Sequence, residues 1–448
     1  MIRVTALVLG LLLAGAGPAA AQGTSAAQIA AEDALTGGRP AEAVARADAI
    51  LTADPENFDA HFVRAAALIE LGRPRAAALA AGAAFRVAPD RTRRLQAARL
   101  ASAARFRARQ FTRAEWWLRR GANNVSNSRE KAEIARSYAE VRKANPLTAN
   151  LSFGVAPVGN FNDGSETDRI RFEGIGEFIL PPEQQALSGI EYTLDLNANY
   201  RLSRSDRAET KVGLYLYGRT YTPSSEAERE VPGIDGGDYA LGVVEGSVWQ
   251  DRLIWPDLGL TTGRAYIGRL WYGGDPFWDY WRLLLSQNVR LADRLNLGLI
   301  VSTERQWGID GRHADTDIHT LEARLLTRRE NGDRVTVSLE KKVYLTEAFE
   351  ASYDQYTLEA SYDRAAPFLG IGWSSSLGIG FTDYEFFYAS LDGRRDDTVF
   401  GSVTATWREV SYLGFSPELE LSVVERESSV DRFSRSSLEI GFGVRSNF

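Results

Sequence analysis

The sequence predicts a multidomain chain in which an α-helical solenoid is followed by an antiparallel transmembrane β-barrel of about 14 strands. Two observations carry this prediction. Residues 26 to about 146 are rich in Ala, Arg, Leu and Glu and repeat with a period of 34, which is typical of stacked helix–turn–helix units. From Leu147 onward, apolar and polar residues alternate with a period of two, which is typical of strands with one apolar face.

The composition excludes several kinds of chemistry. The 448 residues include no cysteine, so there is no disulfide framework, Cys-based zinc site, iron–sulfur cluster or thiol nucleophile. The three histidines are His61, His313 and His319, and no G-x-S-x-G, P-loop or H-E-x-x-H motif is present. We therefore expect no enzymatic activity, no catalytic residues, no metal and no cofactor.

Two polar features of the second half are candidate sites. His319 lies on an apolar strand face and is interpreted as an interfacial side chain without a catalytic duty. Asp392, Asp396 and Asp397 carry ligands of the kind that Ca²⁺ prefers, but Arg394 and Arg395 lie between them, so a solvated turn is predicted instead.

The first 21 residues have the pattern of a secretory signal peptide. Arg3 gives a positive start, residues 4–17 are almost wholly apolar, and Ala19–Ala21 forms a small-residue cleavage site before Gln22. We expect the mature chain to begin near Gln22, outside the cytoplasm, with the boundaries 1–21 for the signal peptide, 22–146 for the helical domain and 147–448 for the barrel.

The helical part contains two clear repeats and one weak copy. In the 34-residue register the first repeat predicts a glycine at the helix–helix turn, a small residue where helices pack closely and a proline that ends the second helix. The residues are Gly38, Ala43 and Pro55, which recur as Gly72, Ala77 and Pro89. A third copy, offset by about three residues, covers 111–118, and a last helix is expected over 128–143. These features resemble the tetratricopeptide (TPR) family, which implies a groove for peptides or partner proteins; the alternative is an ordinary Ala-rich bundle.

Charge divides the chain. Residues 22–146 hold 21 Lys and Arg against 13 Asp and Glu, a net +8, whereas 147–448 hold 30 against 46, a net −16. The excess of arginine is concentrated between 86 and 120. It predicts a surface that binds an acidic partner or anionic lipid headgroups. The alternative is that these arginines form a solvated helix face without a binding role. Nucleic acid is not expected as a partner. The candidate partner-binding residues are Arg91, Arg93, Arg94, Arg105 and Arg109.

The alternating segments are long enough to span a membrane. They run to about 10–15 residues, longer than most strands of soluble sandwiches, and the dense Trp and Tyr run at 271–281 fits an interfacial girdle. Short turns are predicted at 291–293 and 331–332, and long extracellular loops at 161–187 and 223–235. The fourteen expected strands cover 149–160, 188–203, 208–222, 236–249, 256–271, 277–291, 294–307, 314–329, 333–346, 351–363, 370–383, 396–409, 412–426 and 436–448.

The final strand resembles the C-terminal signal that the barrel-assembly machinery of Gram-negative outer membranes reads. Apolar residues alternate along it and the chain stops at an aromatic residue, although Ser446 stands where an apolar residue is usual. The residues of this predicted signal are Leu438, Ile440, Phe442, Val444 and Phe448.

The domain order and two short segments resemble the surface lipoprotein assembly modifier (Slam) family. The segment 154–162, with Pro157 followed by Asn160 and Asn162, is similar to the first barrel strand of that family, and 188–192 is similar to the entry of its second strand. The resemblance implies an outer-membrane translocator that moves client surface proteins or lipoproteins from the periplasm to the cell surface. Its periplasmic TPR domain would bind the client or a periplasmic chaperone, and its barrel, surrounded by outer-membrane lipid, would provide the passage.

Two other functions stay open at this point. TPR-linked polysaccharide-export porins have a similar domain order, although an acidic barrel region disfavours an anionic polymer. A plain diffusion porin would leave the helical domain without a purpose.

Overall fold

The computed structural model describes residues 26–172, 176–256, 258–309, 314–388, 390, 392–407, 410, 412 and 415–446. Two compact units meet at the bond between Pro146 and Leu147. The predicted signal peptide, His313 and Phe448 lie outside the described residues.

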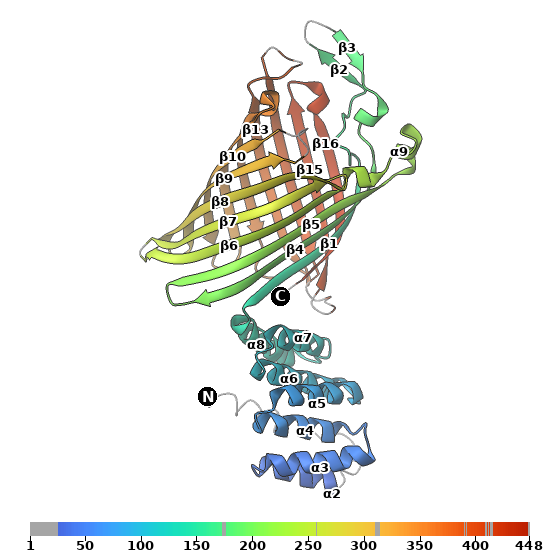
Figure 1. Cartoon of the computed structure of the whole chain (residues 1–448), viewed down its shortest axis with the longest axis vertical. Coiled ribbons are helices and arrows are strands. Elements are labelled where there is room, and N and C mark those ends of the chain that lie inside the picture. Colours follow the sequence, from blue (N-terminus) through green and yellow to red (C-terminus); the bar gives the residue numbers. More distant parts are fainter. Residues whose placement is uncertain are drawn as a thin grey trace. The chain divides into compact units, whose positions relative to one another are not determined.

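Over its described residues, 26–146, the first unit is a stack of seven helices in which each helix packs against the next along the chain (Figure 1). Three helical hairpins and one final helix follow the predicted repeats, so the predicted helical repeat architecture is confirmed, including the degenerate third copy. No helix in the described part of the chain is long and apolar enough to cross a membrane. The helices are α2 Ala26–Thr36, α3 Pro40–Ala53, α4 Phe58–Glu70, α5 Pro74–Val87, α6 Arg91–Arg107, α7 Phe111–Ala122 and α8 Ser128–Ala144.

The turn inside each hairpin has the same backbone form. Gly38 and Gly72 have φ of 69° and 70°, and the N–H of the residue after each glycine donates to the carbonyl five residues earlier. This is a Schellman turn, which requires the left-handed conformation that glycine adopts without steric cost. In the third hairpin the corresponding residue is Arg109, with φ of 58°, and the N–H of Gln110 donates to the carbonyl of Arg105.

Replacing Arg109 by glycine is expected to stabilise the helical domain by roughly 0.5–1 kcal/mol, because a left-handed non-glycine residue costs about 1–2 kcal/mol and the entropy of glycine offsets part of this. The matched control is Gly72→Ala, which should destabilise the domain by a similar amount. Thermal unfolding of the full chain, followed by circular dichroism at the helical band, measures both. Lower stability of Arg109→Gly would contradict this account of the turn.

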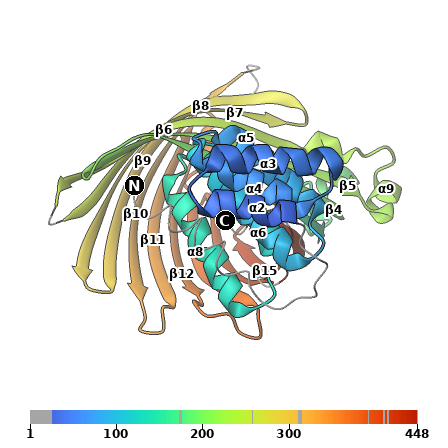
Figure 2. The ribbon, with the colours of Figure 1, turned by 90° about the horizontal axis from the view of Figure 1, so that it is seen from below.

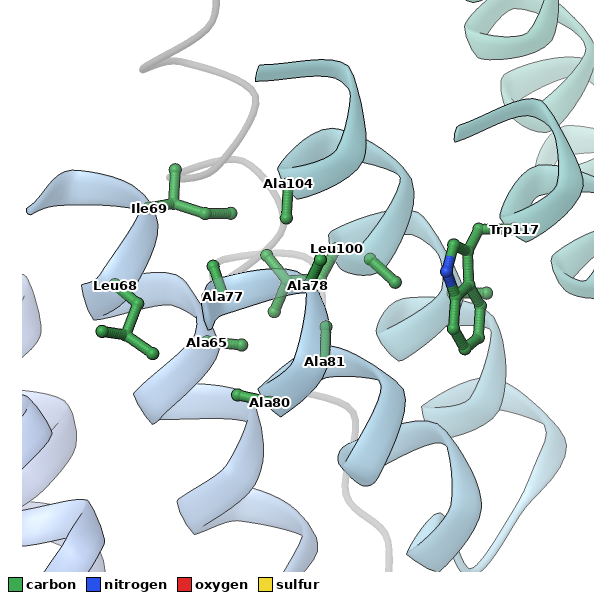
Figure 3. Close-up of a cluster of buried hydrophobic side chains, with 12 residues drawn as sticks. Ala65, Leu68, Ile69, Ala77, Ala78, Ala80, Ala81, Leu100, Ala104 and Trp117 are labelled. Atoms are coloured by element: carbon green, nitrogen blue, oxygen red, sulfur yellow. The ribbon is translucent and has the colours of Figure 1, made fainter. Parts of the chain in front are cut away.

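Small side chains let the helices approach closely. Ala43 and Ala77, predicted at the close contacts, are both fully buried. The main core cluster combines alanines of α4, α5 and α6 with a few large side chains, among them Ile69, Leu100 and Trp117 (Figure 3). Pro55 lies between α3 and α4, and Pro89 between α5 and α6, where each proline follows the end of a helix.

The second unit is a closed antiparallel barrel of fourteen strands, which confirms the predicted fold class. Successive barrel strands pair in sequence order around the wall, and β1 closes the ring by pairing with β16 (Figures 1 and 2). The strands are β1 Leu147–Val158, β4 Gly189–Arg204, β5 Ala208–Pro223, β6 Leu241–Trp255, β7 Gly259–Tyr272, β8 Asp275–Ala292, β9 Leu295–Gly308, β10 Thr316–Arg328, β11 Arg334–Thr346, β12 Tyr353–Asp363, β13 Gly372–Tyr384, β14 Arg394–Thr406, β15 Phe415–Ser428 and β16 Arg435–Ser446.

The two faces of the wall differ in chemistry. One face carries large apolar side chains that are widely exposed, such as Ile267, Leu321 and Leu438, which are 60–71% accessible. The alternate residues on the same strands are mostly polar or charged. The apolar face is therefore the outer, lipid-facing surface and the polar face lines the lumen, as in outer-membrane barrels.

The connections at the two ends of the barrel differ in length. At one end lie the long segments 159–188 and 224–240, which the sequence predicted as loops. The first contains the hairpin β2 Arg169–Phe172 and β3 Gly176–Ile179, which the sequence analysis did not predict; the second contains the short helix α9 Ser225–Glu230. Both loops pack on a small apolar core that includes Phe161, Leu187 and Tyr221. At the other end β1 begins, β16 ends, and the turns include the short segments 205–207 and 293–294.

The predicted solvated turn is wrong for Asp396, although Asp392 does lie in a turn and is exposed. Asp396 belongs to β14 and is buried, and the Arg394 guanidinium donates to its carboxylate at 2.8–3.2 Å. The rings of Tyr384 and Phe433 lie 3.9 and 3.7 Å from the Arg394 guanidinium carbon. Ser428 also donates to Asp396 at 2.6 Å. The alternating charges are therefore a buried ion pair that ties three strands to the loop at 429–434.

Asp333 organises one of the short turns. Its carboxylate accepts hydrogen bonds from the Tyr362 hydroxyl at 2.6 Å, the Ala365 N–H at 2.9 Å and the Asn331 amide at 2.6 Å. These bonds hold the pKa of Asp333 below its ordinary value, and the bond from Tyr362 has the largest effect.

Stability from Asp333 should therefore be fully present above the ordinary aspartate pKa of about 3.9 and be lost as the pH falls through the lower value of the folded state. Asp333→Asn should lower the urea midpoint of the barrel in detergent micelles at pH 7, and this difference should shrink below about pH 4. Asp293→Asn, in an exposed turn, is the control. A difference that is constant with pH would contradict the assignment.

Candidate functional site

The first candidate surface is formed by Arg91, Arg93 and Arg94, and we name it the α6 basic surface. The three residues occupy the first turn of α6, directly after Asp90, whose side chain caps the helix by accepting from the Arg93 N–H at 2.8 Å. All three side chains are exposed. The Arg93 guanidinium carbon lies 5.4 Å from the ring centre of Phe58.

These arginines are unfavourable for the helix that carries them. A helix N-terminus has a partial positive charge, so a basic side chain there costs roughly 0.3–1 kcal/mol. No acidic residue lies in the first turn of α6. Three positive charges thus lie together where the helix dipole would favour acidic residues.

The structure separates the five candidate arginines into two groups. Arg105 and Arg109 lie at the other end of α6, and fourteen residues of helix, about 20 Å, separate Arg91 from Arg105. Arg105 is half-buried and donates to the Gln110 side chain. Its burial, and to a smaller extent the positive charge of Arg113, lowers the pKa of its guanidinium. Arg109 is exposed at the left-handed turn. These two residues are therefore not part of the α6 basic surface.

Several other arginines of the 86–120 run contact neighbouring helices. Arg99 pairs with Glu133 of α8 at 3.1 Å, and Arg107 donates to the Ile69 carbonyl at 3.3 Å. Arg120 lies over the rings of Phe85, Trp116 and Trp117 at 4.5–5.2 Å. The sequence signal for the last of these was the placement of two tryptophans three and four residues before an arginine on one helix.

The lumen is lined by paired charges. Glu245 is buried and accepts from the Tyr280 hydroxyl at 3.0 Å and from Arg282, which also pairs with Glu304 at 3.5 Å. Nearby, Trp249 lies under the Arg264 guanidinium at 3.9 Å. The acidic and aromatic side chains of the lumen are therefore accompanied by arginines. Trp249 belongs to this lining and not to a lipid-facing girdle.

A hollow in the lumen wall lies over β1 and β16. Its floor is made of small residues such as Gly154, Gly441 and Gly443, and its volume is about 290 Å³. Four carboxylates line it, those of Glu191, Glu418, Glu420 and Glu439. Arg445 pairs with Glu418 at 3.1 Å and Arg435 pairs with Glu439 at 3.5 Å, which leaves an acidic excess.

His319 lies on the outer face of the barrel wall. Its ring Nδ1 lies 3.1 Å from the Thr303 hydroxyl on the outer face of β9 and β10. Within the described residues no group of three or more His, Cys, Asp or Glu side chains is arranged to hold a metal ion.

The residues of the predicted assembly signal that the structure describes share one face. Leu438, Ile440, Phe442 and Val444 all point to the outer surface of β16 and are 38–69% exposed. Recognition of this strand by the assembly machinery stays a prediction.

Comparison with family models and with curated protein sequences finds no match. Among solved structures, the first TPR domain of human RPAP3 is 20% identical and matches 26% of this chain and 93% of its own, with a TM-score of 0.22. Acinetobacter baumannii OccAB3 is 10% identical over 67% of this chain and 99% of its own, with a TM-score of 0.35. A bacterial polysaccharide outer membrane secretin is 9% identical over 67% and 98%, with a TM-score of 0.34.

Proposed function

We propose that this protein is an outer-membrane translocator that moves client proteins, surface lipoproteins or related secreted proteins, from the periplasm to the cell surface. The observation that carries the proposal is the direct joining of a TPR-like domain to a closed barrel. Only Asn145 and Pro146 separate the last helix from the first strand. Helical repeat domains present extended surfaces to polypeptides, and a client held there is delivered to the barrel by so short a connection.

The proposed orientation follows from the connections of the barrel. In outer-membrane barrels the short turns face the periplasm and the long loops face outward. The strand β1 begins at the short-turn end, so the helical domain that precedes it belongs to the periplasmic side. There the α6 basic surface binds an acidic segment of the client or of a chaperone.

The lumen wall suits the passage of a polar chain. Its ion pairs and hydroxyl groups offer both hydrogen-bond donors and hydrogen-bond acceptors to a passing chain. The proposed mechanism needs no reacting group. The barrel performs no catalysis in this proposal, and the direction of movement comes from folding of the client outside the cell.

Surface proteomics by protease shaving of a deletion strain and its parent tests the proposal. We expect the deletion strain to lose one or a few proteins from the surface while retaining them inside the cell, with recovery when the chain is restored. An unchanged set of surface proteins together with loss of capsule or matrix would overturn it in favour of a polysaccharide-export porin.

A further inference from the structure

The closure of the barrel is uneven. All twelve residues of β1 pair with β4, and all twelve residues of β16 pair with β15. The two strands pair with each other over only four residue pairs, from Ser152–Arg445 to Val155–Phe442. Pro157 explains where this ladder ends, since proline has no N–H to donate and is tolerated in strands mainly at edges.

Above this short ladder, no further residue pair joins β16 to β1 within the described residues, so the side of β16 that faces β1 is a strand edge without a ladder partner. The Ser436 N–H donates to both carboxylate oxygens of Glu166, at 2.9 and 3.0 Å, and not to a strand. Because backbone groups of a strand alternate between its two neighbours, Leu438 and Ile440 present their N–H and C=O groups on the same side as Ser436. We name these three residues the β16 edge.

The loop 159–188 supplies the side chains that cover the top of this edge. Besides Glu166, Asp163 accepts from the Arg435 guanidinium at 3.3 Å. Both contacts come from exposed side chains, so a competing strand can displace them without disturbing a core.

We propose that the β16 edge is a docking site for an extended polypeptide segment, which adds to the barrel wall as a strand. Strand addition to an exposed edge is a recurrent way of binding extended peptides. The surroundings specify the segment: its outward residues would lie beside Leu438 and Ile440, which are 69% and 42% exposed. Its inward residues would meet Glu420 and Glu439.

The segment that fits therefore alternates apolar residues with lysine or arginine. The hollow over Gly441 and Gly443 leaves room for the inward side chains, and the acidic excess there attracts basic ones. As a site for part of a client, this inference rests on the proposed function and assigns to the barrel wall a chemistry opposite to that of the α6 basic surface.

Disulfide trapping tests the site, because the chain has no cysteine of its own. The purified full chain in detergent micelles carries Leu438→Cys, and the matched control carries Leu421→Cys, an outer-face residue of β15 that is paired on both sides. The probe is a five-residue peptide that alternates Ile and Lys, with its central Ile replaced by Cys, so that it spans the β16 edge without reaching the ladder at Phe442. Paired residues of neighbouring strands are close enough for a disulfide.

We expect at least tenfold more mixed disulfide at position 438 than at 421. A peptide with Glu in place of Lys, or the added changes Glu420→Gln and Glu439→Gln, should reduce trapping several-fold, and Asp163→Asn with Glu166→Gln should increase it. Equal trapping at both positions, or equal trapping of both peptides, would overturn the proposal, as would a disulfide-linked dimer of the chain. Because no client is present, failure here leaves the protein-export proposal to be judged by the surface proteomics.

Discussion

Reversing the charge of Arg91, Arg93 and Arg94 to glutamate is expected to weaken client binding about a hundredfold. Each exposed charge pair contributes up to about 1 kcal/mol, and 1.4 kcal/mol corresponds to a factor of ten. The same changes place acidic residues in the first turn of α6, where they interact favourably with the helix dipole, so the domain should become more stable as it loses function. Titration of the client against the full-length protein, alongside thermal unfolding, measures the two effects separately.

A control with the same change in net charge is available on the same domain. Arg73, Arg75 and Arg129 are exposed and lie outside the α6 basic surface. Their reversal to glutamate should reduce client binding far less, and added salt should narrow the gap between the two triple variants. Equal losses of client affinity in the two triple variants would mean that overall charge, and not this surface, attracts the client. Unchanged client affinity after reversal of Arg91, Arg93 and Arg94 would show that the α6 basic surface does not bind the client.

Replacing Arg394 by alanine is expected to destabilise the barrel by roughly 3–5 kcal/mol. The change leaves the buried Asp396 carboxylate without its cation, and removing one partner of a buried ion pair is far more costly than the net value of the pair. It also removes the group that fills the space between Tyr384 and Phe433. Urea unfolding of the full chain in detergent micelles, followed by tryptophan fluorescence, measures the loss.

The neighbouring residue provides the comparison. Arg395 is exposed on the same strand, with its nearest carboxylate, that of Asp383, at 3.9 Å, so Arg395→Ala should change stability by less than about 0.5 kcal/mol. The double change Arg394→Met with Asp396→Leu should recover much of the stability, because no charge is then left buried. If Arg394→Ala and Arg395→Ala lowered the free energy of unfolding by the same small amount, the buried ion pair would not anchor the loop at 429–434.

The fold was predictable to the level of individual strands because both halves follow a simple period. Alternation placed the expected segment 208–222 on β5 and 333–346 on β11 within one residue of their observed ends. The 34-residue repeat likewise placed Gly38 and Gly72 at their turns. The third turn was harder to locate because Arg109 has the backbone conformation of a glycine there, so the local signal was absent.

The candidate sites were less predictable because they depend on contacts between distant residues. The sequence shows that arginines are numerous between 86 and 120, but it does not show that Arg99 meets Glu133 while Arg91 remains exposed. For the same reason Arg394 and Asp396 resembled a solvated turn. The aromatic residues that enclose Arg394 include Phe433, which comes from a loop almost forty residues further along the chain.

Passage of a client chain through the lumen of this barrel can be tested by photo-crosslinking during export. A benzophenone amino acid is placed at Thr357, which faces the lumen, or at Leu358, its neighbour on β12, which faces the lipid. We expect the client found by protease shaving to crosslink to position 357 while export is in progress, with few or no crosslinks at 358. Equal crosslinking at both positions, or none at 357 while the client still reaches the surface, would contradict passage through the barrel.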